Sequence, residues 1–279
     1  MIPAQKPNLA RRLPQILSLG VAAIAALAIT HTASAQLGTW TADTAFPGSA
    51  GTVISGSGSS LSFTAGSATA STGMVAPFSP ITLTLGQTIT FTGQATFGSL
   101  TALGNIQVRF GIFDTSTPAV STSYKGYLAE IPNNAVGEVN GVIGVGNWAS
   151  NTNNTALTIT SGPSNTAGDA LASGTTAEPF TFTISVTDNG SNSNTVKALL
   201  TSSNGTTYTW QETGTDSATA ADANTVYNEV GFFMGNNTAA NTVNLSNLSV
   251  SIGAVPEPAT VGLVVAGAGM LLTLRRRRR

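Results

Sequence analysis

Apolar and hydroxyl side chains alternate without a break in the stretch Phe180-Thr181-Phe182-Thr183-Ile184-Ser185-Val186. Successive side chains of a strand point to opposite faces, so this period of two predicts a half-buried β-strand. Weaker or shorter versions of the pattern occur at residues 61–63, 81–85, 89–91, 106–112 and 230–234. In the fourth of these, Arg109 falls on the side expected to face solvent.

Three further features predict how such strands are joined. Asn204-Gly205 lies between strand-like residues 196–200 and 206–210, which predicts a hairpin with a tight turn of positive φ. Asp188-Asn189-Gly190 predicts a turn within a longer loop rich in serine and asparagine. The last strand is expected at residues 243–252, and its alternation changes phase at Ser246-Asn247, which predicts a β-bulge.

The body of the chain lacks helical periodicity, apart from room for one short helical turn within residues 218–230. Residues 144–174, rich in Asn, Thr, Ser and Gly, are expected to form a long loop or an irregular edge hairpin. Many short strands separated by turns predict an all-β fold, an antiparallel β-sandwich over residues 36–254 with a jelly-roll-like topology.

The first 35 residues have the three-part order of a secretory signal peptide. A basic opening is followed by an apolar run at residues 13–29 and then by Ala33-Ser34-Ala35. Ala33 and Ala35 are the small residues that signal peptidase reads, so cleavage is expected before Gln36. The alternative is an uncleaved N-terminal anchor helix.

Charge and cysteine content exclude several classes of protein. Between residues 36 and 254 there are three cations and eleven acids, a net charge of −8, although the whole chain carries −1. An acidic body with three scattered cations cannot neutralise a run of phosphates, so no nucleic-acid partner is expected. The chain has no cysteine, which excludes thiol catalysis, thiolate metal sites and disulfides.

The C-terminal residues 255–279 also have three parts. Pro256-Glu257-Pro258 is expected to be extended and stiff, because proline fixes φ and restricts its predecessor. Residues 259–274 are uncharged and mostly apolar, and as a helix they would span about 24 Å, slightly less than a bilayer core. The chain ends with Arg275, Arg276, Arg277, Arg278 and Arg279, which stop transfer and stay cytoplasmic.

These three parts in this order resemble the PEP-CTERM sorting domain, the signal of exosortase substrates, over about 25 residues. The resemblance implies that a membrane transpeptidase-like enzyme recognises Pro256, Glu257 and Pro258 and detaches the body from the apolar helix. It also implies a bacterium that makes exopolysaccharide. The body would be held transiently at the inner membrane and would then reach the cell surface or extracellular matrix. The alternative is a plain C-terminal anchor.

Few residues of the body offer catalytic or metal-binding chemistry. The sole histidine, His31, precedes the expected cleavage site, so the mature body would lack imidazole chemistry. Glu130, Glu212 and Glu229 are candidates for a paired-carboxylate glycosidase but are expected to be surface carboxylates. Residues 188–194 are rich in oxygen and could hold a structural calcium, with no ligands assigned; no other metal or cofactor is expected.

Two tryptophans are candidates for contact with a glycan, because an aromatic ring stacks on the apolar face of a sugar. Trp148 lies in the polar region expected to be a loop, and Trp210 follows Tyr208 at a spacing that places both on one face. The alternative for Trp210 is that it packs in the core.

The sequence therefore favours a non-catalytic exported protein of the surface or matrix that associates with exopolysaccharide. Its expected partners are signal peptidase, an exosortase-type enzyme and, transiently, the inner membrane. Three alternatives stay open: a carbohydrate-binding module with an exposed aromatic row, a polysaccharide-active enzyme with two facing carboxylates, and a self-assembling coat protein.

Overall fold

The computed structural model of the 279-residue chain describes the following residues: 33–44, 52–64, 72–97, 107–115, 125–132, 138–143, 155–161, 179–202, 209–216, 225–234 and 242–253. Within these ranges all the regular secondary structure is β-strand. The described residues contain no apolar helix long enough to cross a bilayer. Thr32–Gly253 form one compact unit. The predicted signal-peptide helix and C-terminal helix lie outside the described residues.

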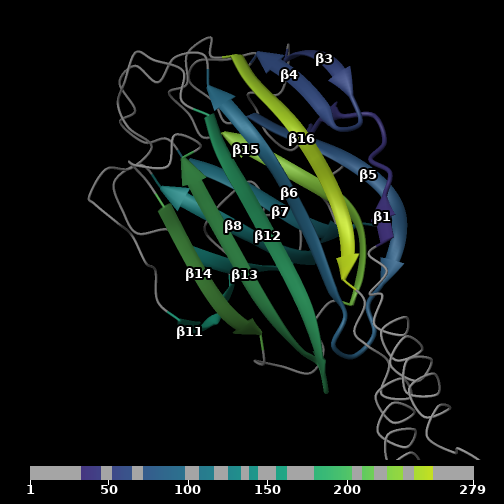
Figure 1. Cartoon of the computed structure of the whole chain (residues 1–279), viewed down its shortest axis with the longest axis vertical. Coiled ribbons are helices and arrows are strands. Elements are labelled where there is room, and N and C mark those ends of the chain that lie inside the picture. Colours follow the sequence, from purple (N-terminus) through teal and green to yellow (C-terminus); the bar gives the residue numbers. More distant parts are fainter. Residues whose placement is uncertain are drawn as a thin grey trace, which may run out of the picture. The chain divides into compact units, whose positions relative to one another are not determined.

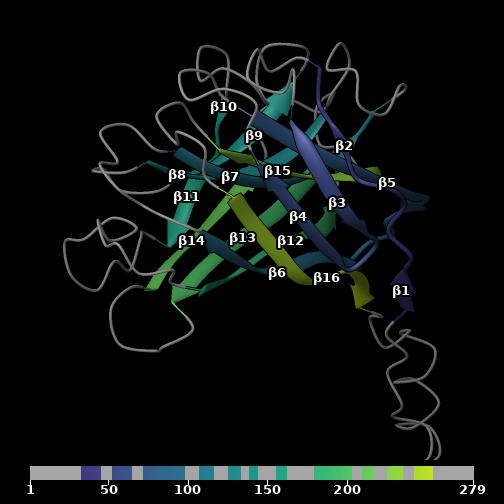
Figure 2. The same cartoon turned by 90° about the horizontal axis from the view of Figure 1, so that it is seen from above.

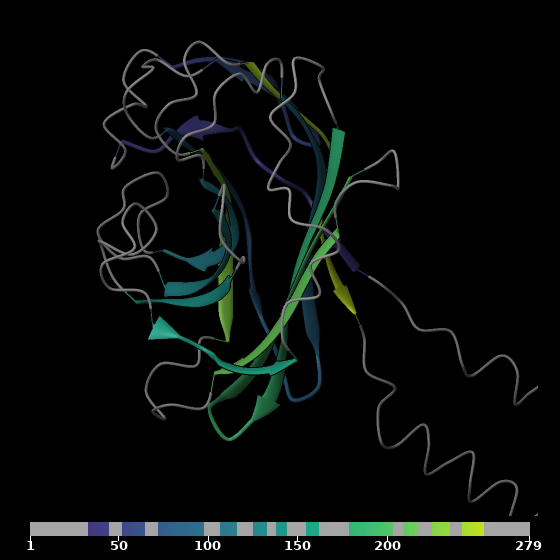
Figure 3. The same ribbon diagram turned by 90° about the vertical axis from the view of Figure 1, so that its left-hand side faces the viewer.

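The strands form two antiparallel sheets, which Figure 1 shows in projection and Figure 3 shows as two facing layers. The nine-stranded sheet has the order β11 (Thr158–Ser161), β14 (Thr209–Asp216), β13 (Ser193–Ser202), β12 (Pro179–Gly190), β6 (Thr88–Phe97), β16 (Thr242–Gly253), β4 (Ser60–Thr64) and β3 (Val53–Ser57), with β1 (Ala33–Ala35) also paired to β16. The seven-stranded sheet has the order β10 (Thr155–Ala156), β9 (Glu138–Ile143), β8 (Lys125–Pro132), β7 (Gln107–Asp114), β15 (Val226–Met234), β5 (Thr72–Thr82) and β2 (Thr41–Ala42). The predicted all-β antiparallel sandwich is confirmed.

The core lies between the two sheets and is centred on aromatic side chains. Phe182 of β12 is fully buried, and its ring contacts Phe91 of β6 in its own sheet with 5.3 Å between centroids. It also contacts Phe110 of β7 and Phe232 of β15 in the facing sheet, at 5.0 and 5.4 Å. The apolar side chains of β12 face this core while its hydroxyls face outward, as the alternation predicts.

The last two strands of the body insert between earlier ones. β16 lies between β6 and β4, and β15 lies between β7 and β5, an interleaving that can also be followed from above in Figure 2. Taken in chain order, β4, β5, β6, β7, β8, β12, β15 and β16 alternate between the sheets except at β7 and β8. They give the order β4-β16-β6-β12 in one sheet and β5-β15-β7-β8 in the other.

The phase change at Ser246-Asn247 is a β-bulge, as predicted. The register between β16 and β6 shifts between Ser246 and Ser249, and Asn247 adopts a left-handed backbone with φ 53°. The bulge turns Leu248 into the core, where it is 3% exposed and lies over Gly93 of β6. A Cβ atom at position 93 would come within 2.5 Å of the Leu248 Cδ2 and 2.7 Å of the Phe182 Cζ.

Substitution of Gly93 with alanine is therefore expected to lower the free energy of unfolding by about 1 to 3 kcal/mol, the usual cost of overpacking a core. Urea denaturation of the body should show a lower midpoint with an unchanged slope. Gly253→Ala is the matched control, because its added Cβ has 3.7 Å to the nearest atom, the Thr88 oxygen. Equal midpoints for the two variants would contradict the overpacking account.

One of the two predicted turns differs from expectation, and the other belongs to a hairpin that is confirmed. A tight turn joins β12 to β13 at Ser191 and Asn192, whose φ angles are 54° and 55°, so the long loop predicted near residue 188 is wrong. Positive φ at both central residues is the geometry that matches strand twist in a two-residue hairpin. The hairpin predicted around Asn204-Gly205 is confirmed by the pairing of β13 with β14. In the observed register Thr201 pairs with Thr209. A two-residue turn centred on Asn204-Gly205 would instead pair Thr201 with Tyr208, so the register differs by one residue.

Three other expectations about strands need correction. The strand predicted at residues 81–85 ends at Thr82, and a turn follows in which the Gln87 N–H donates to the Thr84 oxygen at 2.8 Å. The helical turn considered within residues 218–230 is wrong for residues 226–230, which belong to β15. The region 144–174 contains two short edge strands, β10 and β11, separated by Leu157, and apart from these residues it lies outside the described ranges.

Candidate functional site

The junction of β1 with β16 places the two ends of the body side by side. Ala33 pairs with Ile252, Ser34 with Ser251 and Ala35 with Val250, and the Ser34 hydroxyl donates to the Val250 oxygen at 3.3 Å. Figure 1 shows β1 beside the end of β16. Ala33 and Ala35, the residues predicted to be read by signal peptidase, are therefore part of the sheet, the first exposed and the second half-buried. Pro256, Glu257, Pro258 and the five terminal arginines lie outside the described residues.

The outer face of the nine-stranded sheet carries a regular array of hydroxyl and amide side chains. Rows cross β13, β12, β6 and β16 at one residue per strand, and each member is exposed or half-buried. Three of these rows are Thr201–Thr181–Gln94–Ser246, Leu199–Thr183–Thr92–Ser249 and Lys197–Ser185–Thr90–Ser251. With about 4.8 Å between strands and about 7 Å between alternate residues, this face presents closely spaced neutral groups to solvent.

Neighbouring hydroxyls of this face hydrogen-bond to each other across the strands. The Thr92 and Thr183 hydroxyl oxygens are 2.9 Å apart, and the corresponding atoms of Thr88 and Thr187 are 2.8 Å apart. Such cross-strand pairs stabilise a sheet modestly and hold the side chains in fixed rotamers. The described surface also carries little charge. Among the charged side chains whose burial is described, those that are exposed are Lys125 and Lys197.

The second face of the seven-stranded sheet, away from the core, contains a buried ion pair. Arg109 of β7 and Glu130 of β8 are direct register partners, each 2% exposed, and the Arg109 Nε lies 3.3 Å from the Glu130 Oε2. The Arg109 guanidinium carbon also lies 4.7 Å from the centroid of the Phe233 ring on β15. The expectation of a solvent-facing Arg109 is therefore wrong: its strand is buried on both faces, so alternation there does not separate solvent from core.

The expected surface carboxylates Glu130 and Glu229 are also buried, at 2% and 0% exposure. They lie on strands flanking β7, where Glu130 is opposite Arg109 and Glu229 is opposite Phe113. Two strand spacings and four residues of offset separate their Cα atoms by about 17 Å. Side chains stand roughly perpendicular to a sheet, so two on the same face stay about as far apart as their Cα atoms. Glycosidase carboxyl groups are about 5 to 9.5 Å apart, which this spacing of the two glutamates does not match. The side chain of Glu212 lies outside the description.

A polar link joins the two sheets inside the sandwich. The Tyr127 hydroxyl of β8 donates to the Asp216 Oδ2 of β14 at 2.8 Å and accepts from the Asn194 Nδ2 of β13 at 2.9 Å. Tyr227 of β15, fully buried, belongs to the same region. Burial raises its pKa well above the ordinary value, and Tyr127, Asp188, Asp216 and Asp114 add to the rise. Burial also raises the pKa of Asp114, against the lowering effect of Lys125.

Stability is therefore expected to fall at alkaline pH in a way that Tyr227 controls. The unfolded chain releases the phenol proton near pH 10 while the folded chain retains it, so folding is favoured below that pH and loses free energy above it. The slope for this one group is about 1.4 kcal/mol per pH unit. The free energies of unfolding of the wild type and of Tyr227→Phe, measured by chemical denaturation at steps of about one unit from about pH 8 to about pH 11, test this expectation. An equally steep fall in both proteins would contradict it.

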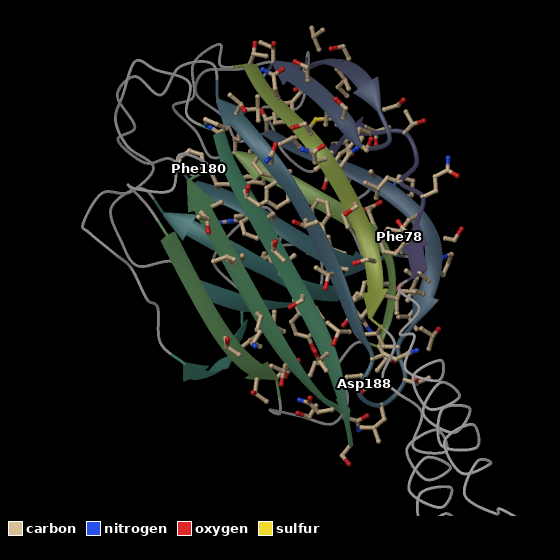
Figure 4. All side chains as sticks on the ribbon, in the orientation of Figure 1. Phe78, Phe180 and Asp188 are labelled. Atoms are coloured by element: carbon tan, nitrogen blue, oxygen red, sulfur yellow. The ribbon has the colours of Figure 1, made fainter. Side chains whose placement is uncertain are left out.

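The calcium hypothesis for residues 188–194 finds no support in the geometry. Figure 4 shows Asp188 at the far end of β12 from Phe180. Its Oδ1 accepts from the Gly190 N–H at 2.7 Å, and the Asn189 Nδ2 donates to the Thr195 hydroxyl at 2.8 Å. Across the described part of the chain, no group of three acidic or histidine side chains gathers as a metal site would require. These oxygen-rich residues build the hairpin turn instead.

The aromatic candidates for glycan contact remain untested. Trp148 lies outside the described residues, and Trp210 is described only by its backbone, where it pairs with Leu200. Every aromatic side chain whose burial is described lies inside the protein. Among them, Trp40 is 2% exposed and donates from its Nε1 to the Gly58 oxygen at 3.0 Å.

No protein-family model matches the chain, and no curated protein matches its sequence. Several solved structures are similar in fold at low identity. They include a lectin from Bauhinia forficata in complex with GalNAc, at 9% identity and TM-score 0.41, with 81% of this chain and 98% of that chain covered. Arcelin-5, a lectin-like defense protein from Phaseolus vulgaris, has 10% identity and TM-score 0.44, covering 79% and 98%. The carbohydrate recognition domain of Emp46p, in metal-free form, has 9% identity and TM-score 0.40, covering 78% and 89%.

Proposed function

We propose that this protein is a non-catalytic, exported component of the cell surface or extracellular matrix, sorted by its C-terminal tail and associated with exopolysaccharide. The observation that carries the proposal is the outer face of the nine-stranded sheet. Its hydroxyl and amide rows offer many hydrogen-bonding groups and, among described residues, a single charge at Lys197. A neutral, hydrated polysaccharide can bind to such a surface without burying protein charges, so the free-energy cost of removing water from charged groups is avoided.

The order of the strands supports a jelly roll as the topology of the body. Its eight principal strands give the orders β4-β16-β6-β12 and β5-β15-β7-β8, in which strands close in sequence are shared between two facing sheets. Jelly rolls are double-sheet folds built from two Greek keys, and the interleaved strand order supports that topology for this body. The other strands, β1, β2, β3, β9, β10, β11, β13 and β14, extend the two sheets.

The enzyme alternative has less support than the non-catalytic one. Of the three glutamates considered as candidates, the two whose side chains are described, Glu130 and Glu229, are buried and too far apart to act as a glycosidase pair. Buried carboxylates held by the sheet instead serve packing, as the Arg109–Glu130 contact illustrates. We propose that the body lacks catalytic activity.

Association with polysaccharide is testable through its salt dependence. The mature body is expected to sediment with the neutral fraction of the exopolysaccharide of the producing cells, equally at about 0.1 M and about 1 M salt, because screening acts on charges alone. Thr90→Glu combined with Ser185→Glu should release the body into the supernatant, since both residues lie in the centre of the outer face.

Lys125→Glu is the matched control, because Lys125 is exposed but belongs to the seven-stranded sheet. It should sediment as the wild type does. A body that stays in solution at every salt concentration, or binding that disappears at high salt, would contradict the proposed mode of association.

A further inference from the structure

The outer edge of β16 is covered by two different strands along its length. β4 pairs with residues 242–245, and β1 pairs with residues 250–252, immediately before β16 ends at Gly253. Because β1 runs antiparallel to β16, the chain that precedes Ala33 and the chain that follows Gly253 are attached to the body at one point. The last three residues of the predicted signal peptide, β1, therefore lie beside the strand that ends just before the predicted sorting tail.

Cleavage after Ala35 would remove β1 and leave the rest of the N-terminal segment in place. Leu37 and Trp40 are buried at 7% and 2% exposure, and the Gly38 N–H donates to the Pro77 oxygen at 2.7 Å. The predicted scissile bond thus separates β1, whose paired strand among the described residues is β16, from a segment anchored in the core. Its removal would open the backbone edge of Val250, Ser251 and Ile252.

We propose that this edge, once opened, docks an extended strand of the enzyme that processes the tail, so that removal of the signal peptide has to precede tail processing. The proposal rests on the proposed sorting function. An unpaired edge binds extended peptides by continuing the sheet. The edge ends three residues before Pro256-Glu257-Pro258, so an enzyme strand lying on it is next to the motif that the enzyme reads.

β1 indicates what kind of strand this edge of β16 accepts. It is an antiparallel strand of small, uncharged residues, with Ala33 and Ser34 exposed and Ala35 packed partly against the core. The opened edge can pair with three residues of an enzyme strand. These backbone contacts would add to the enzyme's recognition of Pro256-Glu257-Pro258. While β1 is present, the edge of β16 at Val250, Ser251 and Ile252 is already paired and cannot take an enzyme strand.

Two variants of the full-length chain, produced in the native cells, test this order of events. Ala33→Phe places a bulky side chain at a position that signal peptidase reads, and since Ala33 is exposed, β1 can keep its pairing. Mass spectrometry is expected to show loss of the tail-less product for this variant. Adding Ser34→Pro removes a donor from β1 and weakens the strand. Tail processing should then return although the signal segment is still attached.

The outcomes separate the inference from the function on which it rests. If the wild-type tail is never removed, the sorting function itself fails. If the wild type is processed and Ala33→Phe is processed equally, or if the double variant stays blocked, the inference is overturned. Resistance of the body to protease verifies that each variant is folded. The chain has no natural cysteine, so a disulfide-linked dimer of mature Ser251→Cys would assign the edge to a second copy and would also overturn the inference.

Discussion

Glu130→Ala is expected to lower the free energy of unfolding of the body by about 3 to 5 kcal/mol, the cost of leaving one member of a buried ion pair behind. Arg109 would then be a 2%-exposed cation without the carboxylate that lies 3.3 Å from its Nε. The ring of Phe233 lies 4.7 Å from the guanidinium carbon, and its cation–π attraction would offset only part of the cost of the buried charge. Chemical denaturation should show the loss as a lower midpoint.

Replacing both members tests whether the charge or the packing is responsible. Arg109→Met combined with Glu130→Leu removes both charges while filling similar space, and it is expected to be close to the wild type in stability or above it. Lys197→Ala, at an exposed position of the other sheet, should change stability by less than about 0.5 kcal/mol. A Glu130→Ala midpoint equal to that of Lys197→Ala would show that the pair is not a stabilising contact.

Glu257→Ala is expected to trap the full-length chain in the inner membrane. The apolar residues 259–274 and the terminal arginines are untouched, so insertion should proceed. The motif Pro256-Glu257-Pro258 would lose its only charged group, and a processing enzyme that reads the motif would lose its recognition. The expected result is accumulation of unprocessed protein and near-complete loss of the body from the matrix fraction.

Mass spectrometry of the mature protein decides between processing and permanent anchoring. Glu178→Ala makes the same change of charge in the body and should be sorted as the wild type is. If peptides from residues 263–279 remain joined to the wild-type body in the matrix fraction, the tail is an ordinary anchor and the processing model fails.

Strands with one face in the core could be predicted from the sequence, and strands buried on both faces could not. β12 alternates without interruption, and β16 alternates on either side of its bulge, because their outer side chains are hydroxyls and amides. β5 was not predictable, because Met74, Val75 and Ala76 are all buried and two prolines interrupt the run. Prolines argue against a central strand, and continuous burial removes the period of two.

The same cause explains the errors about charge. Arg109 and Glu130 occupy positions that alternation assigns to solvent, and their burial depends on what covers the second face of the sheet. Local sequence carries no signal for that cover. Cross-strand partners 21 residues apart, such as Arg109 and Glu130, also cannot be recognised from spacing, since the register depends on the whole sheet.

The insertion of β15 and β16 between earlier strands has a consequence for the time course of folding. β16 and β15, which pair with the inner edges of β4 and β5, come only near the end of the chain, as the pairing of Ser62 with Asn244 shows. Contacts so distant in sequence make loop closure costly and folding slow. Until those two strands are available, each sheet lacks a central strand. The interleaved order therefore makes completion of both sheets depend on the last part of the body, and a chain that ends before Val226 is expected to remain unfolded.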